Sequence, residues 1–180
     1  MNDDLLLAEP DVAYRKAYMA MIQDYRRAGE NRHQQVRVDE MGFNSFVRRL
    51  REESRGRGLQ SGWVPNTTYW MIGPDASIIL GVSNLRHWLT PALEKEGGHI
   101  GYMITPSQRR KGYGTQQLAL CLEKACAMGL DHVLVTCDTD NIGSARIIEK
   151  NGGVLENEVI SDISGKPVSR YWIELRRPWL

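Results

Sequence analysis

Large apolar residues recur at helical spacing in the first third of the chain. Residue 9 opens the start signal Glu-Pro-Asp, and apolar positions three and four residues apart follow it; a second such stripe begins at residue 43. This spacing marks the buried face of a helix, so two helices are expected, with a short strand at residues 5–8 before them. A loop over residues 29–37 separates the helices. The stripes consist of Tyr14, Tyr18, Met21, Ile22 and Tyr25, and of Phe43, Phe46, Val47 and Leu50.

After Pro65 the pattern changes to that of strands. Apolar and β-branched residues come in short runs bounded by Gly, Pro, Asn and Asp, which predicts strands joined by turns. The run Val133-Leu134-Val135 is continuous, as is typical of a strand buried on both faces. The expected strands cover residues 67–72, 77–88, 99–104, 132–137, 154–160 and 168–175.

Two further helices are expected among these strands, at residues 114–128 and 144–150. The strand at 99–104, the helix after it and the strand at 132–137 form one βαβ unit in an otherwise antiparallel sheet. We therefore predict an α/β (mixed α+β) fold with a central, mostly antiparallel sheet of about seven strands and flanking helices. One domain over residues 1–180 accounts for all of these elements.

Composition narrows the function classes. The chain is 42% hydrophobic and 25% charged, which is ordinary for a soluble globular protein, and its net charge of +1 gives no drive toward nucleic acid or a membrane. The first ten residues are acidic where a signal peptide is basic, and no run approaches the roughly 18 apolar residues of a membrane span. The three cysteines lack CxxC spacing, so we expect reduced thiols, no metal site and a cytoplasmic location.

The segment Arg109–Gly114 carries the clearest chemical signal. It lies between a predicted strand and a predicted helix, and glycines at 112 and 114 let successive N–H groups turn toward one anion. The helix start adds unsatisfied amides and the positive end of its dipole. Arg109, Arg110 and Lys111 add mobile positive charge, so a diphosphate is the expected ligand. The alternative is a tight connection without a ligand.

Other phosphate-binding motifs fit this segment poorly. A Rossmann turn has a third Gly or Ala three residues further on, where this chain has Gln117. A P-loop has Gly-Lys-Ser/Thr, whereas the order here is Lys111-Gly112-Tyr113. An enzyme that binds ATP or NAD through this loop stays open as an alternative, and it predicts that those ligands protect the protein against heating.

Two blocks of the sequence resemble the GNAT N-acetyltransferases. Residues 109–114 match the family's Arg/Gln-x-x-Gly-x-Gly/Ala, preceded by the strand Gly98–Ile104. Downstream, Asn141-x-x-Ser144 leads to Glu149-Lys150-x-Gly152, which resembles the family's second block. With the elements between them, the likeness covers roughly residues 66–175.

The resemblance implies a fold, a co-substrate and binding residues. The fourth and fifth strands are expected to splay apart, a parallel pair with the pantetheine arm of acetyl-CoA between them. Asn141 and Ser144 are expected to contact the cofactor, and each has a second interpretation as part of a helix N-cap. The implied cofactor residues are Met103, Ile104, Thr105, Arg109, Arg110, Lys111, Gly112, Tyr113, Gly114, Thr115, Asn141 and Ser144.

Acid and base catalysts are harder to predict. An amine with a pKa of about 10.4 requires roughly 4.6 kcal/mol to be presented neutral at pH 7, so a base is useful. His99 is the first candidate and His87 the second, with a structural histidine as the alternative for each. The tyrosine that the family often uses as an acid is Ile148 here, which leaves Ser144, another tyrosine such as Tyr102 or Tyr171, or water.

The sequence therefore predicts transfer of acetyl from acetyl-CoA to a primary amine of a small molecule or peptide, by direct attack in a ternary complex. A non-catalytic acyl-CoA sensor is the alternative, and a homodimer is possible. Trp70, Trp88 and Trp172 could wall an acceptor site or belong to the core. The arginines at 48–57 alternate with Glu52 and Glu53, which favours a solvated helix face over a site for an anionic acceptor.

Overall fold

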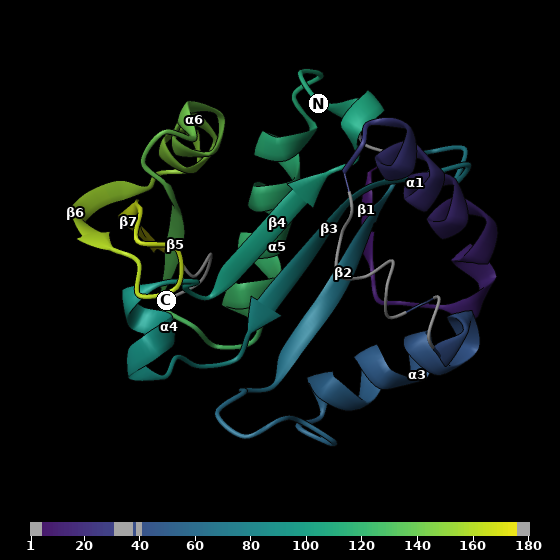
Figure 1. The fold of residues 1–180 in the computed structure, drawn as a ribbon, viewed down its shortest axis with the longest axis horizontal. Helices are drawn as coiled ribbons and strands as arrows, with labels where there is room; N and C mark the ends of the chain where they lie inside the picture. Colours follow the sequence, from purple (N-terminus) through teal and green to yellow (C-terminus); the bar gives the residue numbers. More distant parts are fainter. Residues whose placement is uncertain (1–4, 31–37, 39–40, 176–180) are drawn as a thin grey trace.

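The computed structural model describes residues 5–30, 38 and 41–175. Seven strands form two antiparallel sheets, one of four strands in the order β1-β2-β3-β4 and one of three in the order β5-β7-β6 (Figure 1). The strands are β1 Leu6–Ala8, β2 Asn66–Ile72, β3 Ile79–Arg86, β4 Ile100–Ile104, β5 His132–Asp138, β6 Val154–Ile160 and β7 Pro167–Glu174.

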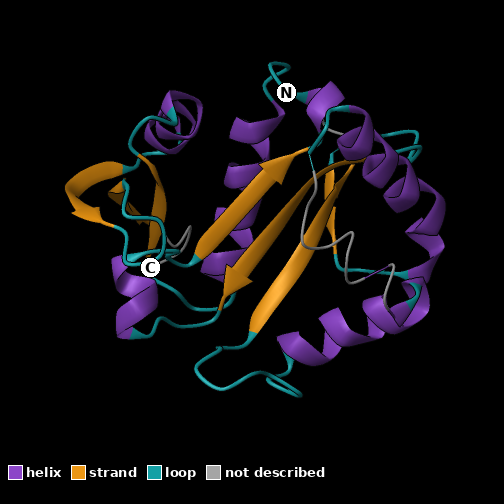
Figure 2. Ribbon diagram, in the orientation of Figure 1, coloured by secondary structure: helices purple, strands orange, loops and turns teal. Residues whose placement is uncertain are grey.

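Helices cover the four-stranded sheet on both faces (Figure 2). The helices α1 (Arg15–Arg27) and α3 (Phe43–Ser54) pack on one face, and α5 (Tyr113–Ala127) packs on the other. Two short elements, α4 (Pro91–Lys95) and α6 (Ile142–Lys150), lie beside the smaller sheet, and single 3₁₀ turns precede α1 and α5.

Each face of the larger sheet buries its own hydrophobic core. Under α1 and α3 the core is aromatic: the ring of Tyr18 lies 4.8 Å from that of Trp70 and 5.4 Å from that of Phe46, measured between centroids. Under α5 the core is aliphatic, with Leu118 and Val133 fully buried. The apolar stripes predicted for α1 and α3 are buried by these helices, except for Tyr14, which lies in the turn before α1 and is half-buried.

The two sheets meet at the start of β4. The His99 N–H donates to the Leu134 carbonyl at 2.7 Å, and beyond this contact β4 pairs with β3 alone in the described chain. The predicted fold class is therefore confirmed. The seven expected strands are present, and the splayed pair β4 and β5 divides them into four and three.

The sequence analysis missed α4. Its start follows the rules for a helix, because Pro91 occupies the first turn and the Thr90 hydroxyl accepts from the Leu93 N–H. At five residues it is too short to show a helical period. The loop expected at residues 29–37 lies largely outside the described residues. No helix in the described ranges is both long and apolar enough to cross a membrane.

Candidate active site

The turn before α5 presents a run of backbone N–H groups. Arg110 and Gly112 both have left-handed φ angles, 63° and 86°, and Gly112 caps α5 without any side-chain hydrogen bond. The N–H groups of residues 110–114 donate to no other residue in the described part of the chain. Thr115, also predicted to bind, already donates its N–H to the Gly112 carbonyl at 3.2 Å. Unpaired amides in such a turn at a helix N-terminus form a site for an anion.

The two glycines of this turn act differently. Gly112 supplies the left-handed φ angle and has open space around it. Gly114 has an ordinary φ angle, but a Cβ atom there would lie 2.6 Å from Cδ1 of Ile147 on α6. Gly112 therefore shapes the anion site, and Gly114 allows α5 and α6 to approach each other.

The cations of the turn are only partly free. The Arg109 guanidinium forms two hydrogen bonds with the Glu30 carboxylate, at 2.7 and 2.9 Å, and a third with the Ile104 carbonyl at 3.2 Å. Glu30 thereby raises the pKa of Arg109. The expectation of a mobile charge at Arg109 is corrected: this residue ties the turn to the end of α1. Arg110 has no ion pair with any residue that the structure describes.

The free edge of β4 follows from its hydrogen bonds with β3. The Thr105 N–H donates to the Leu80 carbonyl, and the His99 carbonyl accepts from the Arg86 N–H. Antiparallel ladders alternate, so residues 99, 101, 103 and 105 direct their backbone polar groups at β3. The N–H groups of Tyr102 and Ile104 therefore point away from β3, toward the side on which β4 and β5 part into separate sheets, a side that we call the cleft.

This alternation corrects the prediction for Thr105. Its N–H is bonded to Leu80, its hydroxyl donates to the Ile79 carbonyl at 2.6 Å, and its own carbonyl accepts from Gln108. Thr105 is fully buried, and its N–H, hydroxyl and carbonyl each already have a partner in the protein, which argues against a contact with a cofactor. Met103 also directs its backbone at β3, and its side chain packs into the core under α1. Of the three residues predicted here, Ile104 has a backbone N–H that faces the cleft.

The start of α6 lies across the cleft from β4. Asn141 caps this helix, because its Oδ1 accepts from the Ser144 N–H at 3.0 Å. The Ser144 carbonyl accepts from the Tyr102 hydroxyl at 3.4 Å, so Tyr102 bridges β4 and α6. Burial raises the pKa of Tyr102 to about 12, which keeps its proton in place at neutral pH.

His99 sits where the two sheets separate, with 7% of its surface exposed. Its Nδ1 accepts from the Leu134 N–H at 2.9 Å, which leaves the proton of the neutral ring on Nε2. Burial lowers the pKa of His99 to about 4, with smaller effects from the charges of His132 and Arg86. With its lone pair engaged, the ring cannot accept a proton from an amine, and this geometry argues against the predicted role as a base.

The other predicted acid–base candidates lie away from the cleft. His87 Nε2 lies 2.9 Å from the Thr67 hydroxyl, at the end of β3 opposite to the one that pairs with Thr105. Ile148, which replaces the family's tyrosine, is fully buried in the core under α5, and Tyr171 belongs to the same core. Within the described ranges, no three His, Cys, Asp or Glu residues gather as a metal site.

A cavity of about 400 Å³ opens on the face of the four-stranded sheet that α1 and α3 cover, opposite to α5. It lies between α3, α4 and strands β2 and β3. Two of its residues, Thr68 and Asn84, share a hydrogen bond of 2.9 Å. Two rings that line it are Trp70, fully buried, and Trp63, which is 51% exposed. The sequence analysis did not single out Trp63 or Asn84, because neither lies in a motif.

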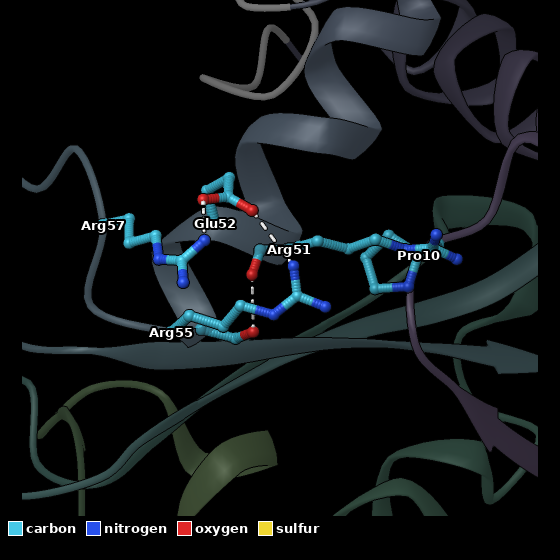
Figure 3. Close-up of polar contacts among 6 residues, drawn as sticks. Pro10, Arg51, Glu52, Arg55 and Arg57 are labelled. Carbon is cyan, nitrogen blue, oxygen red and sulfur yellow. Dashed lines mark hydrogen bonds and ion pairs between the residues drawn. The ribbon is translucent and has the colours of Figure 1, made fainter.

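Several arginines of α3 and of the turn after it form ion pairs on the surface, which fits the solvated face expected there (Figure 3). Arg55 and Arg57 both contact the Glu52 carboxylate, at 3.0 and 3.4 Å. Arg51 donates to the Pro10 carbonyl at 2.8 Å and pairs with Asp11. These contacts fasten α3 to its neighbouring segments and use up the charges that an anionic acceptor would need.

The cleft, the unpaired amides and the free β4 edge together suit an extended ligand with a diphosphate at one end. The model of the acetyltransferase (GNAT) domain family matches residues 5–154. The chain therefore belongs to the GNAT acetyltransferases, and the predicted family and enzyme class are confirmed. No curated protein sequence matches it.

Solved structures of acetyltransferases share the fold at low sequence identity. RimL, a ribosomal L7/L12 α-N-protein acetyltransferase in complex with coenzyme A, is 16% identical, with a TM-score of 0.68 over 96% of this chain and 95% of that one. The microcin C7 self-immunity acetyltransferase MccE, in complex with acetyl-CoA and AMP, is also 16% identical, with a TM-score of 0.66 over 96% and 93%. The ribosomal-protein-S5-alanine acetyltransferase of Vibrio fischeri is 11% identical, with a TM-score of 0.67 over 98% and 94%.

Proposed function

We propose that this chain transfers the acetyl group of acetyl-CoA to a primary amine by direct attack within a ternary complex. The observation that carries the proposal is the run of unpaired N–H groups at residues 110–114, at the mouth of the cleft between β4 and β5. Family membership and neighbours crystallised with coenzyme A or acetyl-CoA support the same co-substrate.

The binding roles follow from the geometry of the cleft. The amides of residues 110–114 and the N-terminus of α5 would hold the diphosphate, with Arg110 and Lys111 as exposed cations beside it. The pantetheine arm would lie along the free edge of β4 and pair with backbone groups of Tyr102 and Ile104. Asn141 would contact it from α6 through its side-chain nitrogen, since its oxygen caps the helix.

The chemistry at that edge is nucleophilic acyl transfer. The lone pair of the neutral amine forms a bond with the thioester carbonyl carbon, the C–S bond breaks, and the thiolate leaves with its electron pair while the amine nitrogen loses a proton. A cleft-facing N–H of β4 would stabilise the negative charge on the carbonyl oxygen. Tyr102 is the acid candidate on geometry, because its hydroxyl reaches from β4 to the Ser144 carbonyl at the start of α6.

The experiment is a thiol-release assay over a panel of amines, run beside calorimetry with acetyl-CoA. We expect acetyl-CoA to bind and thiol to appear only when an amine is present. Tight binding without turnover over the whole panel would support the acyl-CoA sensor. The absence of the family tyrosine, replaced here by Ile148, favours that alternative. Failure to bind acetyl-CoA, with protection by ATP or NAD instead, would overturn the proposal.

A further inference from the structure

The cavity under α3 lies one strand away from the edge where acetyl would be bound. Asn84, on the cavity wall, pairs with Gly101 of β4, so both residues face the same side of the sheet. Adjacent strands are about 4.8 Å apart. Gly101 is followed directly by Tyr102, whose N–H faces the cleft. The path from the cavity to the β4 edge thus crosses a single residue.

That residue has no side chain, and the space above it is open. Among the described residues, a Cβ atom built on Gly101 would have no non-neighbouring atom within 4 Å, and its φ angle is one that any residue adopts. Neither backbone conformation nor packing therefore requires glycine at this position. Glycine leaves the face of β4 beside Asn84 without a side chain, between the cavity wall and the free edge of the strand.

The chemistry of the walls defines what the cavity can hold. About 400 Å³ is at the small end of ligand pockets, and Phe46 and Trp70 give it an apolar interior. Its two charged residues have partners in the protein: Glu53 pairs with Arg49 at 3.0 Å, and Arg86 donates to the carbonyls of Gly97 and Gly98 at 2.9 Å. The cavity wall therefore presents no unpaired cation among the described residues that would bind an acidic or phosphorylated ligand.

Trp63 extends the apolar lining to the surface. Trp63 is 51% exposed although it lines the cavity, so a ligand in the cavity can also cover this side chain. An indole also attracts an ammonium group over its face, by about 0.5 to 2 kcal/mol. Trp63 can thus guide a charged amine toward the cavity and then pack against its body.

We propose that this cavity is the acceptor pocket, that it takes a compact primary amine with an apolar or aromatic body, and that Gly101 is the opening through which the amino group reaches the β4 edge. This inference rests on the proposed acetyl transfer and specifies its acceptor. The Thr68–Asn84 pair supplies hydrogen bonds beside the opening. A protein N-terminus is the competing acceptor and is included in the test.

The experiment compares wild-type protein with Gly101→Val, Trp63→Ala and the control Trp88→Ala. Trp88 is the matched control because it is 53% exposed and does not line the cavity. Each protein is assayed with 2-phenylethylamine and with a hexapeptide that has a free N-terminal serine. Calorimetry measures acetyl-CoA binding, and tryptophan fluorescence measures amine binding without turnover.

We expect Gly101→Val to bind acetyl-CoA within about threefold of wild type, since valine suits an extended strand and fills open space. Its kcat/KM for 2-phenylethylamine should fall at least 100-fold. Trp63→Ala should raise KM for the amine about tenfold with kcat unchanged and abolish the fluorescence response to the amine, whereas Trp88→Ala should do neither.

Full amine turnover by Gly101→Val, or a wild-type preference for the peptide over the amine, would overturn the acceptor assignment while the acetyltransferase proposal stands. If Gly101→Val does not fold, the comparison of Trp63→Ala with Trp88→Ala decides the question. If wild-type protein does not bind acetyl-CoA, the proposed function fails, yet a fluorescence response that only Trp63→Ala abolishes would still support the pocket.

Discussion

The two halves of the site are built in different ways. The proposed cofactor half comes from one stretch of chain, the end of β4, the turn and the start of α5, and it would bind mainly through backbone amides. The acceptor half comes from α3, β2, β3 and α4, and it is defined by side chains from separate segments. A contiguous backbone site leaves a motif of glycines in the sequence, whereas a site assembled from distant side chains leaves none.

The two halves share strand β4 without sharing its residues. One edge of β4, at Tyr102 and Ile104, serves the cofactor, and one face, at Gly101, opens toward the acceptor cavity. Substitutions in each half should therefore alter one substrate and spare the other.

The largest expected effect is on the cofactor half. In Gly112→Asp the new residue tolerates the left-handed φ angle, but its carboxylate lies beside the expected diphosphate. The affinity for acetyl-CoA should therefore fall about 1,000-fold, or about 4 kcal/mol. Gly152→Asp is the control, because its φ angle of 85° and open surroundings match those of Gly112 (86°) at the far end of α6. Calorimetry in which both variants lose affinity equally would refute a site at the turn.

His99, which lies where the two sheets separate, should make the stability of the fold depend on pH. The pKa of His99 is about 4 in the folded chain and about 6.5 when unfolded, so the unfolded state binds a proton that the folded state excludes. The free energy of unfolding should lose on the order of 3 kcal/mol as pH falls from about 6.5 to about 4, and this contribution should be constant above that range.

Urea unfolding of His99→Asn measures this contribution, because that variant lacks the titrating ring. Its stability should depend on pH less than that of wild type by the same amount. His132→Gln is the control, since His132 is exposed and lies beside His99. If the loss of stability at acid pH persists in His99→Asn and disappears in His132→Gln, the titrating group is His132 and the prediction for His99 is wrong.

A smaller effect, on the stability of the fold, distinguishes Gly114 from Gly112. Gly114→Ala should destabilise the fold by about 1 to 2 kcal/mol, because its Cβ would collide with Ile147 Cδ1. Acetyl-CoA affinity should change much less than in Gly112→Asp. Adding Ile147→Val removes the colliding methyl group, so thermal unfolding of the double variant should recover most of the loss. If it recovers none, Gly114 does not act through α6.

Sequence reasoning succeeded where local chemistry decides structure. The apolar stripes of α1 and α3, the glycine turn and the buried run at 133–135 each follow from neighbours in the chain. It also anticipated the divergence of β4 and β5 through family resemblance. The number of strands and their succession along the chain needed no long-range information, whereas the position of β7 between β5 and β6 was not predicted.

The remaining features depend on contacts between distant segments. Whether the His99 ring accepts a proton from substrate or a hydrogen bond from Leu134 depends on where β5 lies, 35 residues later. Arg109 is tied to Glu30, 79 residues away. Trp63 lines a cavity only because α3 and α4 flank the same strands. Such pairings have no local signature, which is why Trp70 was the one residue of the proposed acceptor cavity that the sequence brought forward for an acceptor site.

The smallest expected effect concerns the acid at the boundary of the two halves. Tyr102→Phe removes the hydroxyl that bridges β4 and α6, so kcat should fall about tenfold while KM for acetyl-CoA stays the same. The loss should be modest because a thiolate with a pKa of about 8.5 leaves readily without a proton. Ser144→Ala is the matched control, since Tyr102 contacts the backbone of Ser144 and not its side chain.

Comparing alkyl-thioester donors of different leaving-group pKa sharpens the test: the deficit in kcat of Tyr102→Phe should grow as the thiol becomes more basic if Tyr102 donates the proton. A deficit that does not vary with the thiol would mean that Tyr102 only braces the cleft.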